Sequence, residues 1–177
     1  MNPPPSNPHE ILFQGKRFAV ARVPQPCNDG TVRDREVILH PGSVVVVPMV
    51  SPHEVCLVEV LRVAVGRTLL ELPAGTLDHG DEPPIETAAR ELAEETGYRA
   101  GRIEPAGAFW MSPGILRERM HLYVAHDLVP GVQALEPGEL IQPKIMAFED
   151  AVAMCLDGRI DDAKTVAGIL TVAMRRR

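Results

Sequence analysis

The sequence predicts an α+β fold, and three features of the chain point to it. Short apolar runs typical of β-strands fill much of residues 9–72 and resume after the middle of the chain. Between them, the stretch from Ile85 to Thr96 has the periodicity of an amphipathic helix and is closed by Gly97. Two further helical segments, 148–156 and 161–175, follow at the end. Strands around a central helix, with helices last, are typical of α+β architecture.

Composition indicates a soluble globular protein. The 177 residues are 45% hydrophobic and carry a formal net charge of −6, which suits one domain with a real core. The acidic balance offers no general attraction to nucleic acid or to an anionic membrane, so we expect neither as a partner. No run is long enough to span a bilayer, and residues 1–8 lack the features of a signal peptide. Three scattered cysteines without a C-x-x-C pair indicate reduced thiols in a cytoplasmic protein.

The N-terminal part of the chain is predicted to be a small β appendage. Residues 1–8 are polar and Pro-rich and are expected to be disordered. Strands are predicted at residues 11–13, 17–23 and 31–40. Asp29-Gly30 supplies a turn, and Pro41-Gly42 ends the last strand. Residues 9–41 therefore form an antiparallel subdomain that precedes the main domain, residues 42–177.

The main domain is predicted to contain strands on both sides of the helix. These strands are expected at residues 44–47, 55–60, 68–72, 102–111, 121–128 and 142–147. Val44 to Val47 is an unbroken β-branched run that stops at Pro48, so it predicts a strand buried on both faces. The two terminal helices are separated by Asp157-Gly158.

The helix from Ile85 to Thr96 carries the residues of chemical interest. With about 100° per residue, it separates an apolar side from an acidic side. The apolar side holds Ile85, Ala88, Leu92 and Thr96, and the acidic side holds Glu91, Glu94 and Glu95. The i,i+4 repulsion between Glu91 and Glu95 would be relieved by a metal, and the cluster suits one because Mg²⁺ binds carboxylates and substrate phosphates. A solvated amphipathic helix explains the pattern as well. Arg90 borders the acidic side, where it can pair with Glu86.

The order of residues from Arg90 to Tyr98 resembles the core of the Nudix box, G-x5-E-x7-R-E-U-x-E-E-x-G-U, where U is apolar or aromatic. Counting back from Arg90 places Glu82 at the first Glu of the box. Six residues instead of five separate Gly75 from Glu82, so either the loop has an insertion or Asp81 replaces Glu82. The resemblance implies a mixed sheet sandwiched between helices and the hydrolysis of a nucleoside diphosphate linked to another group.

The same resemblance implies roles for individual residues. The implied metal ligands are Ala74 through its carbonyl, Glu91, Glu95, Glu94 in second rank and Glu82 through water. The implied cation is Mg²⁺, with Mn²⁺ as the alternative. The implied catalytic residues are Glu94, Glu95, Glu139 and Arg90, the last by orienting carboxylates. In the loop before the last strand, Glu136 is the alternative to Glu139 as general base or further ligand.

The C-terminal segment from Gly158 to Thr165 is similar to the ADP-ribose pyrophosphatases. Two further segments resemble these enzymes in particular, namely Glu71 to Gly75 and Ser112-Pro113-Gly114. They imply a nucleotide-sugar substrate, ADP-ribose, cleaved to AMP and ribose 5-phosphate. The implied substrate-binding residues are Arg62, Arg67, Pro113, Gly114 and Glu71, because a fixed guanidinium suits a diphosphate. The resemblance covers roughly residues 36–173.

Other interpretations of the sequence remain open. One is a different nucleotide-sugar diphosphatase, for example one acting on GDP-mannose. Another is a Nudix-fold module that binds such a ligand without hydrolysing it. The appendage has too little core to be stable alone, and relatives use such a segment to pair across a two-fold axis, so a homodimer is expected.

Overall fold

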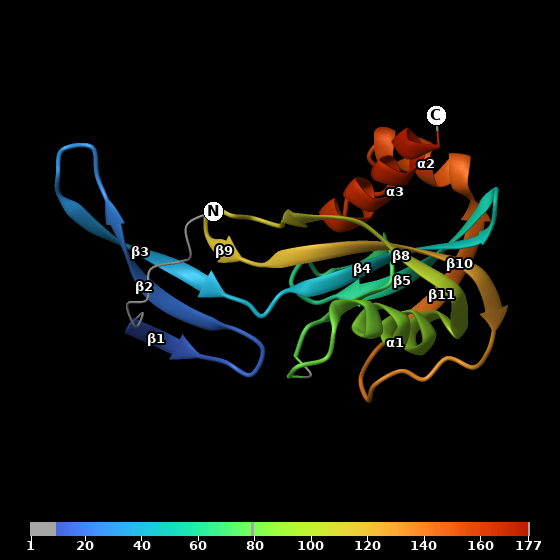
Figure 1. Ribbon diagram of the computed structural model, residues 1–177, viewed down its shortest axis with the longest axis horizontal. Helices are drawn as coiled ribbons and strands as arrows, with labels where there is room; N and C mark the ends of the chain where they lie inside the picture. Colours follow the sequence, from blue (N-terminus) through green and yellow to red (C-terminus); the bar gives the residue numbers. More distant parts are fainter. Residues whose placement is uncertain (1–9, 79, 177) are drawn as a thin grey trace.

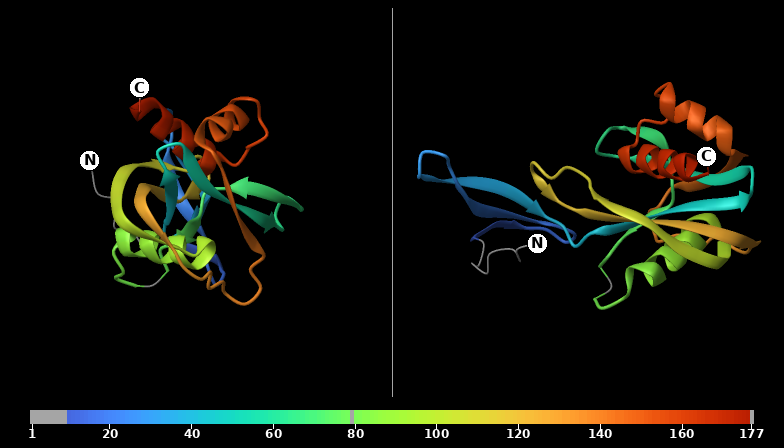
Figure 2. Two further views of the ribbon diagram at one scale, coloured as in Figure 1. Left: turned by 90° about the vertical axis from the view of Figure 1, so that its right-hand side faces the viewer. Right: turned by 45° about the horizontal axis from the view of Figure 1, so that its top comes forward.

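The computed structural model describes residues 10–78 and 80–176, and the prediction of disorder for residues 1–8 lies outside them. At one end a β arm projects from the main domain (Figures 1 and 2). Its strands are β1 (Glu10–Gln14), β2 (Ala19–Pro26) and β3 (Val32–Leu39), paired antiparallel as predicted. A two-residue strand that the sequence does not predict, β9 (Leu116–Arg117), joins β3 in parallel. The main domain therefore completes the sheet of the arm.

The large sheet has seven strands in the described residues. They are β4 (Ser43–Ser51), β5 (Glu54–Arg62), β6 (Arg67–Glu71), β7 (Ala74–Thr76), β8 (Tyr98–Trp110), β10 (Arg119–Pro130) and β11 (Ile141–Ala147). The order is β11-β5-β4-β10-β8, with β6 beside β5 and β7 beside β4. Strands β4 and β10 are parallel and the other pairs antiparallel, so the sheet is mixed. Strand β7 is absent from the sequence prediction because three residues show no periodicity.

Helices cover both faces of this sheet, which confirms the predicted α+β fold (Figure 1). They are α1 (Pro84–Thr96) on one face and α2 (Phe148–Leu156) with α3 (Ala163–Arg175) on the other. Val44 and Val46 pack in one core with Leu92 of α1, whereas Val45 and Val47 face the second core. This two-sided burial explains the unbroken valine run. Within the described part of the chain, no helix has the length and apolar character needed to cross a membrane.

Helix α1 differs from the prediction on both of its sides. Ile85, predicted to face the core, is 41% exposed, because only the later turns at Ala88 and Leu92 pack on β4. Glu95, predicted to lie on an open acidic side, is only 7% exposed, because β7 covers that part of the helix. The helix ends as predicted, with Gly97 in the left-handed conformation that favours glycine.

Candidate active site

A cavity of about 590 Å³ lies against the acidic side of α1. This volume is in the range of small-molecule sites. Of the residues singled out from the sequence, its lining includes Arg62, Ala74, Glu91, Glu94, Glu95, Glu136 and Glu139. The structure thus brings together the predicted carboxylates, one predicted arginine and the loop before β11.

Gly75 lies directly beneath Glu91. A Cβ on Gly75 would overlap the Cγ, Cδ and Oε1 atoms of Glu91, so only glycine permits this approach. The pairing of β7 with β4 holds Gly75 opposite Val44. Gly75 therefore occupies the place where α1 needs a glycine. The one additional residue between Gly75 and Glu82 falls in the loop after β7.

Glu82 rather than Asp81 pairs with the arginine of α1. Arg90 donates hydrogen bonds to Glu82, to Glu91 at 2.9 Å and to Glu94 at 3.0 Å. Among the described residues, these three are the ion-pair partners of Arg90, so the expected pair with Glu86 does not form. Arg90 fixes the orientation of three carboxylates, which is the geometry that an orienting role requires.

The carboxylates of α1 are crowded. Burial raises the pKa of Glu91 to about 7, with Glu94 and Glu139 adding to the shift and Arg90 opposing it. Burial likewise raises the pKa of Glu95 to about 8, with repulsion from Glu91 and Glu139, although Glu95 accepts a hydrogen bond from the Ala74 N–H at 3.1 Å. The site therefore favours a bound cation, because a cation stabilises the ionised carboxylates.

The donor set fits a hard divalent cation, since Glu91, Glu95 and Glu139 offer carboxylate oxygens around the β7 main chain. Within residues 10–78 and 80–176, no three His, Cys, Asp or Glu side chains already stand in a coordinating arrangement. Arg90 holds Glu91, and Ala74 holds Glu95. Coordination would therefore turn these carboxylates away from their present partners.

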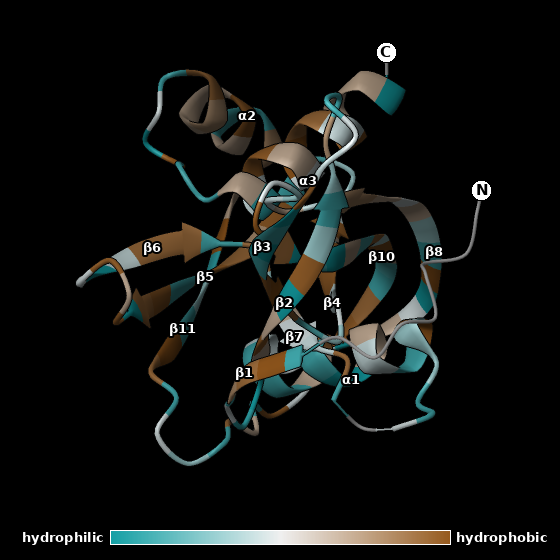
Figure 3. Cartoon of the chain, turned by 90° about the vertical axis from the view of Figure 1, so that its left-hand side faces the viewer, coloured by the Kyte–Doolittle hydropathy of each residue, from teal (hydrophilic) through white to brown (hydrophobic). Residues whose placement is uncertain are grey.

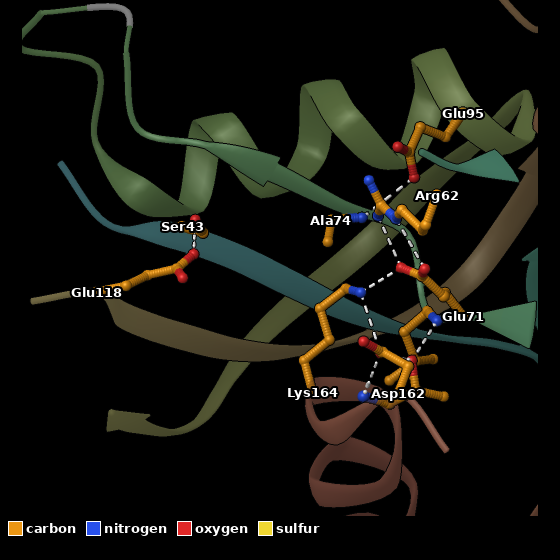
Figure 4. A network of polar contacts seen from close by, with 10 residues as sticks. Ser43, Arg62, Glu71, Ala74, Glu95, Glu118, Asp162 and Lys164 are labelled. Atoms are coloured by element: carbon orange, nitrogen blue, oxygen red, sulfur yellow. Dashed lines mark hydrogen bonds and ion pairs between the residues drawn. The ribbon is translucent and has the colours of Figure 1, made fainter. Parts of the chain in front are cut away.

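An ion network around buried Glu71 forms the cationic wall of the cavity (Figure 4). Arg62 of β5 donates two hydrogen bonds, of 2.8 and 2.7 Å, to Glu71 of β6. Lys164 of α3 donates to Glu71 and, at 3.0 Å, to Asp162. Although burial opposes ionisation, Arg62 and Lys164 hold the pKa of Glu71 below its ordinary value. Asp162 also accepts the Thr165 N–H, which caps α3. Arg62 and Lys164 both line the cavity.

Several predicted substrate-binding residues lie elsewhere. Glu71 is 1% exposed and is absent from the cavity lining, because Arg62 and Lys164 occupy its carboxylate. Arg67 pairs with Asp161 outside the cavity. Pro113 and Gly114 are exposed in the loop between β8 and β9, beside the arm.

Two cationic residues of the cavity are missing from the sequence prediction. Lys164 belongs to a segment that resembles the ADP-ribose pyrophosphatases, but only the fold shows that it lines the cavity. Arg17, between β1 and β2, reaches the lining from the arm. Neither carries a local signal, because both positions depend on contacts between segments far apart in sequence.

Known proteins resemble this chain over most of its length. The family model of the NUDIX domain matches residues 39–168. The ADP-ribose pyrophosphatase of Bacillus subtilis (strain 168) is 33% identical over 162 residues, covering 90% of this chain and 87% of that protein. The methanol dehydrogenase activator of Bacillus methanolicus is 34% identical over 164 residues, covering 90% and 87%. The crystal structure of an ADP compounds hydrolase has a TM-score of 0.79 at 25% identity, covering 93% of this chain and 89% of that one.

Proposed function

The chain belongs to the NUDIX family of hydrolases, and on that premise we propose that it hydrolyses ADP-ribose to AMP and ribose 5-phosphate with a divalent metal. The observation that carries the proposal is that acidic and basic side chains line the same cavity. Glu91 and Glu95 supply oxygens for a cation, and Arg62 and Lys164 supply positive charge for a diphosphate. The similarity to an ADP-ribose pyrophosphatase over most of both chains supports the choice of ADP-ribose.

Arg62 and Lys164 bind the diphosphate in this proposal. Two hydrogen bonds to Glu71 use the Nε and one Nη group of Arg62, which leaves the other Nη group for phosphate oxygens. Because Glu71 fixes both cations, little side-chain freedom is lost when the substrate binds. The predicted substrate-binding role of Glu71 is therefore indirect.

Glu91, Glu95 and the main chain of Ala74 would hold Mg²⁺ or Mn²⁺, with Glu94 and Glu82 in supporting roles. Such an ion, when bound, neutralises phosphoryl oxygens and lowers the pKa of a bound water. Glu139 accepts the proton of the attacking water. We assign this role to Glu139 rather than Glu136 because the charge of Glu139 raises the pKa of both Glu91 and Glu95.

A homodimer built on the arm is also part of the proposal. Strand β1 and the following loop expose the apolar side chains of Ile11, Leu12, Phe13 and Phe18, and Figure 3 colours part of β1 as hydrophobic. Exposed apolar patches of this kind mark association surfaces. Arg17, in the same loop, lines the cavity, which supports a contribution of the arm to the site.

A cytoplasmic location is proposed from the cysteines. Cys27, Cys56 and Cys155 are all free. Burial raises the pKa of Cys56 and Cys155 to about 11, so neither thiol ionises appreciably near neutral pH. Unpaired thiols of this kind are typical of reducing compartments.

The test is product analysis with Mg²⁺ on ADP-ribose and, in parallel, on GDP-mannose. We expect AMP and ribose 5-phosphate to form fastest, and Glu95→Gln to slow the reaction by about 100-fold or more. Glu149→Gln, at an exposed position on α2, is the matched control and should leave the rate unchanged. Faster cleavage of GDP-mannose than of ADP-ribose would show that the substrate is a different nucleotide sugar. Binding of ADP-ribose without turnover at any divalent metal would indicate a binding module.

A further inference from the structure

The loop of residues 131–140, which carries the proposed base, is tied to the C-terminal end of α1. This loop joins β10 to β11 and passes the helix end in Figure 1. An α-helix leaves its last carbonyl groups without partners inside the helix. Here the loop supplies donors for two of them. The Ala134 N–H donates to the Glu94 carbonyl at 3.0 Å, and the side-chain amide of Gln133 donates to the Glu95 carbonyl at 2.7 Å.

The amide of Gln133 also reaches the other end of the loop. It donates a second hydrogen bond, of 3.1 Å, to the carbonyl of Ile141, the first residue of β11. A primary amide has two N–H donors, so one nitrogen can serve both carbonyls. Ile141 is buried against Val58 and Val60, which fixes this end of the bridge to the large sheet. One side chain therefore connects the end of α1 with both ends of the loop.

The main chain of the loop packs closely on the helix end at the same point. A Cβ on Gly131 would lie 2.8 Å from the carbonyl oxygen of Gly97, and a Cβ on Gly97 would lie 3.1 Å from the main-chain nitrogen of Gln133. Glycine at both positions permits this approach. The close packing brings the Gln133 side chain within reach of the Glu95 carbonyl.

The part of the loop that contains Glu139 is a closed turn. The Glu136 N–H donates to Glu139 Oε2 at 2.9 Å, and the Glu139 N–H donates to the Glu136 carbonyl at 3.1 Å. Gly138 within the turn has the left-handed conformation that favours glycine. Because the turn is held by its own hydrogen bonds, its position relative to α1 depends on where the loop ends are held. Glu139 lines the cavity together with Glu91 and Glu95, so a shift of the loop ends changes the separation of these residues.

We infer that Gln133 is a positioning residue for the hydrolysis, because its amide sets the place of Glu139 relative to the carboxylates of α1. The inference rests on the proposed function, in which Glu139 accepts the proton of the attacking water. Gln133 is absent from the cavity lining, so its effect on the reaction passes through Glu139. A displacement of about 1 Å at a catalytic group can lower a rate by about 100-fold.

The test is a double-mutant cycle of Gln133→Met and Glu139→Gln, assayed on ADP-ribose with Mg²⁺. Methionine has a side chain of similar length and lacks the two donors. We expect Gln133→Met to lower kcat by about 10- to 100-fold and to keep KM within about twofold, because Arg62 and Lys164 still hold the diphosphate. In the Glu139→Gln background, the same substitution should have almost no further effect on kcat, since the residue that it positions no longer acts.

Two further variants and a second measurement sharpen this test. Gln133→Lys should recover most of the lost kcat, because an ammonium group can donate to both carbonyls and suits a helix C-terminus. Gln142→Met, at an exposed position of β11 outside the cavity lining, is the matched control and should behave as the wild type. Hydrogen–deuterium exchange of residues 134–140 requires no activity. It should be faster in Gln133→Met and unchanged in the control.

The outcomes separate this inference from the proposed function. Additive losses in the cycle, a loss in KM rather than kcat, or no recovery in Gln133→Lys overturns the inference, because a general structural effect does not depend on Glu139. An unchanged kcat in Glu139→Gln alone also overturns it, while the hydrolysis itself then stands. If Gln133→Met does not fold, Gln133→Asn takes its place in the cycle, because the shorter side chain cannot reach both carbonyls.

If the wild type cleaves neither ADP-ribose nor GDP-mannose, the proposed function fails. Exchange then decides whether Gln133 positions the loop. Faster exchange of residues 134–140 in Gln133→Met than in Gln142→Met supports this role, and equal exchange in the two variants overturns it.

Discussion

The guanidinium of Arg62 holds the carboxylate of Glu71 through two hydrogen bonds, of 2.8 and 2.7 Å, and the carboxylate is 1% exposed. The amine of Lys164 reaches the same carboxylate from α3. One buried anion therefore fixes two cations that come from different elements. Its role is to shape the cationic wall rather than to contact the substrate.

Glu71→Gln should destabilise the protein and weaken substrate binding together. Removing the anion leaves buried Lys164 with Asp162 alone, and breaking a buried pair costs about 3–5 kcal/mol of unfolding free energy. Denaturant unfolding and KM for ADP-ribose measure the two effects. The matched control is Glu59→Gln, because Glu59 pairs with Lys144 at the surface at 2.8 Å and should contribute less than about 1 kcal/mol. Equal effects of the two variants would contradict the assignment.

Gly75→Ala should remove most of the activity through a clash with Glu91. The added methyl group overlaps the outer atoms of the Glu91 side chain, so either the carboxylate or β7 must move. We expect a loss of about 1–3 kcal/mol of stability and of most turnover. In a Glu91→Ala background the overlapping atoms are gone, so the stability loss caused by Gly75→Ala should disappear. A loss of the same size in both backgrounds would show that the clash is not the cause.

Without metal, the protein should become less stable as the pH rises from about 5 to 8. Unfolded glutamates titrate near 4.5, whereas burial raises the pKa of Glu91 to about 7 and that of Glu95 to about 8. In this window the folded state binds more protons than the unfolded state, so stability falls with rising pH. Thermal melting without metal measures the fall. The double variant Glu91→Gln, Glu95→Gln should show a flatter profile, and an unchanged slope would contradict this origin.

Mg²⁺ should raise the melting temperature more at pH 8.5 than at pH 6. The cation binds ionised carboxylates, so below the raised pKa values it must displace protons. Melting curves at a fixed Mg²⁺ concentration provide the comparison, with Na⁺ at equal ionic strength as the control. A larger shift at pH 6 would show that these carboxylates do not hold the metal.

Deletion of residues 1–41 should yield an inactive protein with the mass of a monomer. The deletion removes Arg17 from the cavity and the apolar surface of β1. Because it also removes the partner of β9, Phe13→Asp is the sharper test: Phe13 is 54% exposed, so a charge there should block association without unfolding the arm. Light scattering gives the mass. Val132→Asp, at a side chain far more exposed, is the control, and a dimeric Phe13→Asp variant would exclude β1 from the interface.

The sequence predicts those parts of the fold whose signal is local. Helix α2 has the predicted bounds, and the valine run of β4 is buried on both faces. Both signals depend on neighbouring residues, namely helical periodicity and an unbroken β-branched run. The order of residues from Arg90 to Tyr98 likewise predicts the family, because their spacing along α1 places the carboxylates on one side of the helix.

The parts that escape prediction depend on distant contacts. Glu95 is buried because β7 crosses it, and β7 exists only through pairing with β4. Lys164 of α3 is held at the cavity by its ion pair with Glu71 of β6. Helical periodicity gives the direction of a side chain but not what covers it. The position of Glu95 was therefore predictable, whereas its burial was not.

The short pairing between β3 and β9 changes how the arm is attached. A single connection from β3 into β4 would act as a hinge, free to swivel about the segment around Gly42. The pairing of β9 with β3 adds a second attachment, because the chain continues from β9 through Glu118 into β10. Two attachments restrict the rotation that one would allow. Ser43 and Glu118 follow these two connections, share a hydrogen bond and line the cavity, so the attachment of the arm is continuous with the cavity wall.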